Sequence, residues 1–103
     1  MASYKLSKQA AKDLKSIYKK SHTDFGKTQA ESYTRDLGGR FSLLTSFPGM
    51  GLPADISTKS YFKFPSGSHV IYYMKTDYGI LIGRILHSAQ LPSKQFFPLD
   101  DGN

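Results

Sequence analysis

An arginine and a histidine lie three residues apart at the end of the apolar run "ILIGRILH", residues 80–87. An arginine can hold an anionic group through paired hydrogen bonds, and a histidine can transfer a proton near neutral pH. Arg84 and His87 could therefore be a catalytic pair, a binding patch, or the polar edge of a sheet. Because side chains alternate along a strand, we expect the two residues on opposite faces, and joint action would need a bulge or the strand end between them. Alternation groups Arg84 with Ile80, Ile82 and Leu86, and His87 with Leu81, Gly83 and Ile85.

The turn "TDYGI" determines which residues of the preceding strand face this pair. A three-residue loop over residues 77–79, with glycine in the left-handed conformation, would place Thr76 opposite Ile80. A two-residue loop would shift the register by one and remove the resulting pairs. The three-residue register pairs Tyr72 with Arg84 and His69 with His87.

Each of these residues also has a purely structural explanation. A histidine in a strand is more often a hydrogen-bonded structural residue than a catalyst. Arg84, among aliphatic residues, must reach an acid, solvent or the carboxylate of a partner, because an unpaired buried charge is costly. Lys63 and the strand tyrosines have the composition of a nucleic-acid surface, but strand tyrosines more often pack in a core.

Composition excludes several classes of protein. The 103 residues are 39% hydrophobic and predict a single globular domain. The chain has no cysteine, and His22, His69 and His87 lack a local carboxylate cluster, so we expect no metal and no cofactor. No apolar run is long enough to cross a membrane and no signal peptide follows Met1, so we expect a cytoplasmic protein that does not bind membranes. The net charge of +6 favours an acidic partner, although a solvated helix face explains most of the lysines.

Periodicity predicts an α+β domain of order β-α-α-β-β-β. "SYKLS" suits a short first strand, Ser7 is a candidate N-cap, and two helical patterns follow, over residues 8–20 and 30–47. The pair Gly38-Gly39 within the second pattern predicts a kink or a close backbone contact. After "SFPGMGLP", three strands of an antiparallel meander are expected in "YFKF", "HVIYYMK" and "ILIGRILH". The helical hairpin should cover one face of the sheet, with one domain over residues 1–91 and a mobile tail over residues 92–103.

Four stretches in order, "DFGKTQAESYTRDL", "SFPGMG", "YFKFPSGSHVIYY" and "IGRILHSAQ", resemble the ParE toxins of type II toxin-antitoxin modules, in the RelE/ParE superfamily. The resemblance covers nearly the whole chain, and it implies the same fold, with the first strand at an edge of the sheet. The chain departs from the ParE pattern at Phe62, where a basic residue is common, and at Gln90 and Leu91, where a Met-Asp pair is common.

The resemblance implies a growth inhibitor that binds and poisons DNA gyrase and is held inactive by a ParD-like antitoxin. Operator DNA would be bound only through the antitoxin. The alternative is the RelE branch of the superfamily, whose members cleave messenger RNA on the ribosome and need cations and a proton-transfer group. No tyrosine follows Tyr78 to serve such a site, and we therefore expect a binder rather than an enzyme, with no catalytic residue assigned. The candidate residues for contact with the target are Lys63, Arg84, His87 and His69.

Antitoxin recognition can be predicted from physical chemistry. An acidic amphipathic segment should place aliphatic side chains against the helical hairpin and carboxylates against basic residues. The candidate residues for contact with the antitoxin are Leu14, Tyr18, Arg40 and Lys63.

Overall fold

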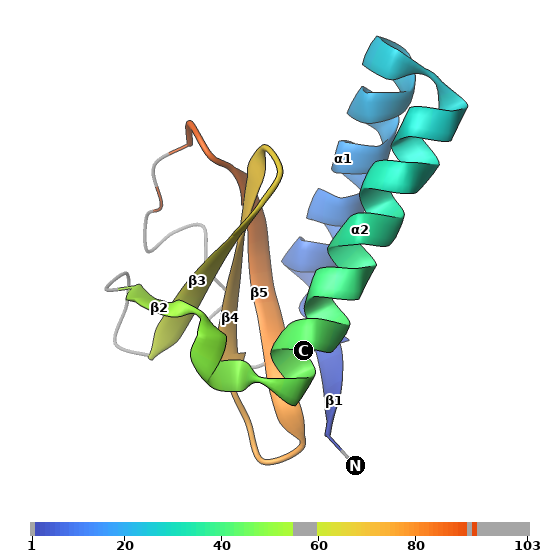
Figure 1. Cartoon of the computed structure of the whole chain (residues 1–103). Coiled ribbons are helices and arrows are strands. Elements are labelled where there is room, and N and C mark those ends of the chain that lie inside the picture. The colour runs from blue at the N-terminus through green and yellow to red at the C-terminus, as the bar shows by residue number, and fades with distance from the viewer. Residues whose placement is uncertain (1, 55–59, 91, 93–103) are drawn as a thin grey trace.

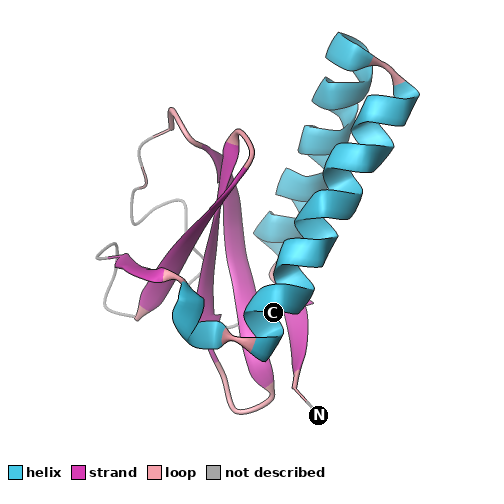
Figure 2. Cartoon of the chain, in the orientation of Figure 1, coloured by secondary structure: helices cyan, strands magenta, loops and turns pink. Residues whose placement is uncertain are grey.

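Two helices pack on one side of a five-stranded sheet (Figure 1). This is a computed structural model, and it describes residues 2–54, 60–90 and 92. The elements confirm the predicted α+β class, and they add a 3-10 helix and a short strand before the meander (Figure 2). In chain order they are β1 (Ser3–Leu6), α1 (Lys8–Phe25), α2 (Lys27–Ser46), the 3-10 helix η1 (Pro48–Met50), β2 (Leu52–Ala54), β3 (Tyr61–Ser66), β4 (His69–Lys75) and β5 (Gly79–His87).

The helical hairpin begins at the predicted cap. The Ser7 side chain accepts a hydrogen bond from the Ala10 amide at 3.0 Å, which satisfies an amide that the first turn leaves unpaired. Gly26 separates the helices with a φ of 92°, a value that favours glycine. Helix α2 then runs without interruption through Gly38 and Gly39. Of the two predicted alternatives, a kink or a close backbone contact, the contact is wrong, because no described atom outside the local helix lies within 4 Å of a Cβ built at either position. The kink stays a prediction.

The sheet order is β1-β5-β4-β3-β2. Strand β1 lies at one edge and runs parallel to β5, while all other pairs are antiparallel. Strand β2, at the other edge, was not predicted. Its three residues include Pro53, which lacks an amide donor, and a strand so short has no readable period.

The β4–β5 hairpin confirms two predicted cross-strand pairs, but its loop is shorter than predicted and β5 contains a bulge. Thr76 lies opposite Gly79, and not opposite Ile80: the Thr76 amide donates to the Gly79 carbonyl at 3.0 Å across a two-residue loop. The register then shifts by one residue, because Tyr73 pairs with Ile82 and Tyr72 with Arg84, which leaves Gly83 as a bulge. The bulge restores the predicted pairs, Tyr72 with Arg84 and His69 with His87.

The bulge also corrects the predicted grouping of side chains on β5. Ile80, Ile82 and Ile85 all belong to the core cluster beneath the helices. Arg84 and Leu86 lie on the other face, which we call the outer face, where Leu86 packs with Tyr72 and Tyr61. Arg84 therefore does not share a face with Ile80 and Ile82, because the inserted Gly83 breaks the alternation.

The predicted tail, residues 92–103, lies outside the described residues apart from Pro92. The predicted boundary of the domain after residue 91 stays a prediction.

Candidate functional site

Arg84 is engaged by an acid from α1. Its Nε donates to Asp13 Oδ2 at 2.7 Å and its Nη2 donates to Asp13 Oδ1 at 2.9 Å, a two-point contact. The two side chains are only 15% and 14% exposed. The sequence allowed Arg84 to contact an acid of the same chain, solvent or the carboxylate of a partner, and the structure shows the acid of the same chain. This contact weakens Arg84 as a candidate for binding a target.

Asp13 also closes the edge of β5 beyond the point where β1 ends. Its Oδ2 accepts the Ile85 amide at 3.0 Å. At the start of α1, the hydroxyl of the N-cap residue Ser7 donates to the Gly83 carbonyl at 2.7 Å. The Asp13 carboxylate and the Ser7 hydroxyl thus satisfy two backbone groups of β5 that β1 does not reach. Because Asp13 also binds Arg84, the Asp13–Arg84 pair joins α1 to β5 as a structural unit.

Asp13 was missed by sequence reasoning. A signal was available, because Asp13 lies between the buried Ala10 and Ile17 on the core face of α1, where an acid needs a partner. The partner itself is 71 residues away, and nothing local identifies it.

His69 and His87 do meet on the helix side, at the end of the hairpin. Their rings lie edge to face with centroids 5.4 Å apart. The Tyr33 hydroxyl, from α2, lies 2.6 Å from His69 Nδ1 and accepts the Ser68 amide at 3.0 Å. Tyr33 was missed as a site residue, although it lies within the quoted stretch "DFGKTQAESYTRDL".

The surroundings of His69 favour its neutral ring. Burial lowers the pKa of His69, the nearby His87 lowers it further, and Asp13 opposes both. His87 is exposed, and its Nδ1 accepts the Ala89 amide at 3.1 Å, so a neutral His87 carries its proton on Nε2. The cluster is held by Tyr33 against the turn at Gly67, where a Cβ would lie 2.7 Å from the tyrosine ring.

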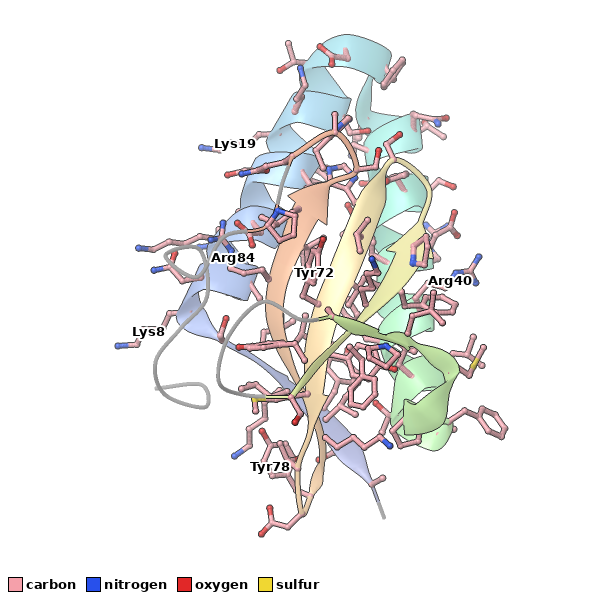
Figure 3. All side chains as sticks on the ribbon, turned by 90° about the vertical axis from the view of Figure 1, so that its left-hand side faces the viewer. Lys8, Lys19, Arg40, Tyr72, Tyr78 and Arg84 are labelled. Atoms are coloured by element: carbon pink, nitrogen blue, oxygen red, sulfur yellow. The ribbon has the colours of Figure 1, made fainter. Side chains whose placement is uncertain are left out.

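The structure separates the cations from these histidines. Lys63, Tyr72 and Arg84 occupy one row across β3, β4 and β5, and this row lies on the outer face. Figure 3 views that face, with Tyr72 in the middle of the sheet and Arg84 toward α1. Because His69 and His87 lie on the helix side, the four predicted target-contact residues do not converge on one point.

Two predicted antitoxin-contact residues share a groove on the helical hairpin. Leu14 and Tyr18 line an apolar groove of about 440 Å³ between α1 and α2. Lys15 and Lys19 form its basic border. The groove is completed by Leu6, Ala11 and Thr34.

The lysines of this border belong to a longer exposed row on α1. Lysines recur at intervals of four, three and four residues, the spacing of one helix face. None of them forms an ion pair with another described residue. The row consists of Lys8, Lys12, Lys15 and Lys19, and Lys8 and Lys19 mark its two ends in Figure 3.

The other two predicted antitoxin-contact residues lie outside the groove. Arg40 is on the exposed surface of α2, two turns before its end, and Lys63 is exposed on β3 opposite Leu52 of β2. The structure thus places Leu14 and Tyr18 in the groove, and it places Arg40 and Lys63 outside the groove, on α2 and β3.

The described residues contain neither a metal-binding cluster nor a membrane-spanning helix. No group of three or more His, Cys, Asp or Glu side chains in residues 2–54, 60–90 and 92 could hold a metal ion. Neither described helix has the length and apolar composition needed to span a bilayer.

Comparisons with known proteins agree with one another. Residues 4–92 match the family model described as "ParE toxin of type II toxin-antitoxin system, parDE". The chain is 35% identical over 89 residues to Toxin ParE1 of Caulobacter vibrioides, covering 86% of this chain and 92% of that protein. It is 32% identical to Toxin ParE1 of Mycobacterium tuberculosis, covering 82% and 87%.

A solved structure described as the chromosomal ParDE TA system from P. aeruginosa has a similar fold. It aligns with a TM-score of 0.70 at 22% identity, covering 84% of this chain and 96% of that one.

Proposed function

This chain belongs to the ParE toxin family of type II toxin-antitoxin systems, and we propose that it inhibits growth by binding and poisoning DNA gyrase until a ParD-like antitoxin neutralises it. On this proposal the toxin acts in the cytoplasm, needs no cofactor, and reaches operator DNA only through the antitoxin.

The observation that carries the antitoxin part of the proposal is the groove between α1 and α2. Leu14 and Tyr18 offer an apolar floor to an amphipathic segment, and Lys15 and Lys19 stand where its carboxylates would lie. An acidic segment that folds on binding would gain affinity from the groove and a faster association rate from the lysine row.

Charge reversal in the groove tests this contact. The probe is the protein encoded by the reading frame next to this gene, and the readout is its Kd for the toxin. We expect Lys19→Glu to weaken binding about tenfold or more, because it puts an acid where the segment carries acids. Lys27→Glu is the matched control, since Lys27 is exposed at the start of α2 and does not line the groove. Equal Kd values for both variants would refute the assignment.

A supercoiling assay and a cleavage-complex assay with purified gyrase test the target. Wild-type toxin should inhibit supercoiling and raise the amount of cleaved DNA, and added antitoxin should reverse both effects. No effect at micromolar toxin, together with messenger cleavage on ribosomes, would reject gyrase in favour of the RelE-like alternative.

The ribosome-dependent endoribonuclease stays the second candidate. The contact of His69 with His87 and Tyr33 favours it, since such groups can transfer protons. The Asp13–Arg84 ion pair and the position of Lys63 on the outer face weigh against it, because the cations that would stabilise a phosphorane lie away from the histidines. Loss of messenger cleavage in His87→Ala, with antitoxin binding retained, would favour the nuclease.

A further inference from the structure

Three large apolar side chains are exposed within six consecutive residues at the β2 edge of the molecule. Phe47 is 59% exposed, Met50 46% and Leu52 63%. We call these three residues the edge patch. Single exposed apolar residues are ordinary on a protein surface, but three within one short segment are typical of a contact surface.

The backbone that carries the edge patch is held from beneath by one buried tyrosine. The Tyr73 hydroxyl donates to the Pro48 carbonyl at 2.8 Å and accepts the Gly51 amide at 2.9 Å. Tyr73 itself is fully buried in the core. Gly51 lies so close to the Tyr73 ring that no side chain would fit between them, since a Cβ would lie 2.9 Å from a ring carbon.

This anchoring matters for binding. A segment that is already fixed loses little conformational freedom when a partner docks, so more of the contact energy appears as affinity. The protein thus holds the backbone beneath three water-exposed apolar side chains, an arrangement that contributes little to its own core.

One cation adjoins the edge patch across the sheet, and a second lies on the helix that leads into it. Lys63 lies directly opposite Leu52 in the β2–β3 pair, and Arg40 lies two helical turns before Phe47. Neither forms an ion pair with any residue in the described part of the chain. An apolar centre with unpaired cations at its border complements a protein surface that has an apolar recess bordered by carboxylates.

We propose that the edge patch, with Arg40 and Lys63 at its border, is the surface through which the toxin contacts gyrase, separate from the groove that holds the antitoxin. This inference rests on the proposed function. A second copy of the chain fits the patch less well, because docking it on itself would bring the cations of both copies together. An anionic membrane fits less well too, because two cations contribute only about 2 kcal/mol to such attachment.

The test compares four toxins in the gyrase supercoiling assay: wild type, Phe47→Ser/Met50→Ser, Leu52→Thr, and Phe25→Ser. Phe25 is the matched control, because it is 71% exposed at the far end of the helical hairpin. The double variant should need at least about tenfold more toxin for half-inhibition, and Leu52→Thr should show a smaller loss in the same direction. Phe25→Ser should match wild type. Thermal unfolding of every variant establishes that the fold is retained, and Leu52→Thr keeps a strand-forming residue at the β2 edge.

The outcomes separate the inference from the proposed function. Inhibition by wild type and Phe25→Ser, with loss in the patch variants at unchanged unfolding temperature, supports the inference. Equal inhibition by all four overturns the inference and leaves the proposed function standing. No inhibition by wild type overturns both.

Three parallel measurements cover the other occupants. The Kd for the protein encoded by the neighbouring reading frame reports antitoxin binding, flotation with phosphatidylglycerol and phosphatidylcholine vesicles reports membrane binding, and sedimentation velocity reports self-association. If the patch variants lose any of these properties while inhibiting gyrase normally, the patch belongs to that occupant and the inference is wrong.

Discussion

Replacing Asp13 with alanine should destabilise the fold strongly, although the change removes only a few atoms from a helix that is mostly solvated. The carboxylate accepts three hydrogen bonds, two from the Arg84 guanidinium and one from the Ile85 amide. Asp13→Ala would leave an arginine that is 15% exposed without this partner, and it would leave the Ile85 amide without its acceptor.

The magnitude follows from the burial of the pair. Removing one partner of a buried ion pair costs about 3–5 kcal/mol, and we expect the lower end, about 3 kcal/mol, because both side chains keep some contact with water. For a domain of this size, such a loss lowers the unfolding temperature by roughly 12–24 °C. Asp13→Asn should cost less, because an amide oxygen can still accept the Ile85 amide.

The assay is urea unfolding followed by circular dichroism, with the free energy of unfolding extrapolated to water. Asp24→Ala is the matched control in the same helix. Asp24 pairs with Lys20 at 3.2 Å, but these side chains are 41% and 79% exposed, so its loss should cost only about 0.3–0.5 kcal/mol.

A double-mutant cycle isolates the pair itself. Arg84→Met removes the charge that Asp13 compensates, so Asp13→Ala/Arg84→Met should be clearly less destabilised than the sum of the single changes, with a coupling of about 2 kcal/mol. Additive single effects, or equal costs for Asp13→Ala and Asp24→Ala, would refute the reasoning.

Three further expectations follow from single contacts. Gly79→Ala should lower the unfolding temperature sharply in a thermal melt, because φ is +147° there and a Cβ would collide with the Ser3 carbonyl; an unchanged melt would contradict the close approach of β1. Tyr73→Phe should cost about 1–2 kcal/mol and speed amide exchange at Gly51, because two hydrogen bonds to the η1 segment are lost; unchanged exchange would show that the hydroxyl does not hold this segment. The lowered pKa of His69 means that the unfolded chain binds the proton more tightly than the folded chain, so the contribution of neutral His69 to stability is present above about pH 6.5 and is lost as the pH falls below that value. Denaturant titrations at several pH values should show a smaller loss of stability at low pH in His69→Gln than in wild type. Identical pH profiles for the two proteins would argue against this role of His69.

The sequence was enough to predict the helical hairpin, the meander and the two cross-strand pairs of the last hairpin. The pairs were predicted from a three-residue loop, but the loop has two residues, Asp77 and Tyr78. The one-residue bulge at Gly83 compensates for the missing loop residue and restores the predicted pairs. A glycine inside a strand is a signal for a bulge, but its position is stabilised by Ser7, 76 residues away in the chain. Local patterns cannot supply contacts of that range.

The candidate site shows the same limit. The sequence required that Arg84 find an acid, solvent or a partner, and only the packing of α1 on β5 selects Asp13. The groove residues Leu14 and Tyr18 were accessible to sequence reasoning, since helical spacing alone places them near one another. The anchoring of the edge patch by Tyr73 was not, because it depends on a buried hydroxyl that joins two backbone groups outside its own strand.

The parallel pairing of β1 with β5 has a consequence for how the protein is made. Strand β1 is synthesised first, yet its strand partner comprises residues 79–87, and the Ser7 and Asp13 contacts also await that segment. Contacts of such long range must close a large loop, which delays their formation. A nascent chain that lacks β5 cannot build this sheet, so a fragment that ends before residue 79 lacks the toxin's fold.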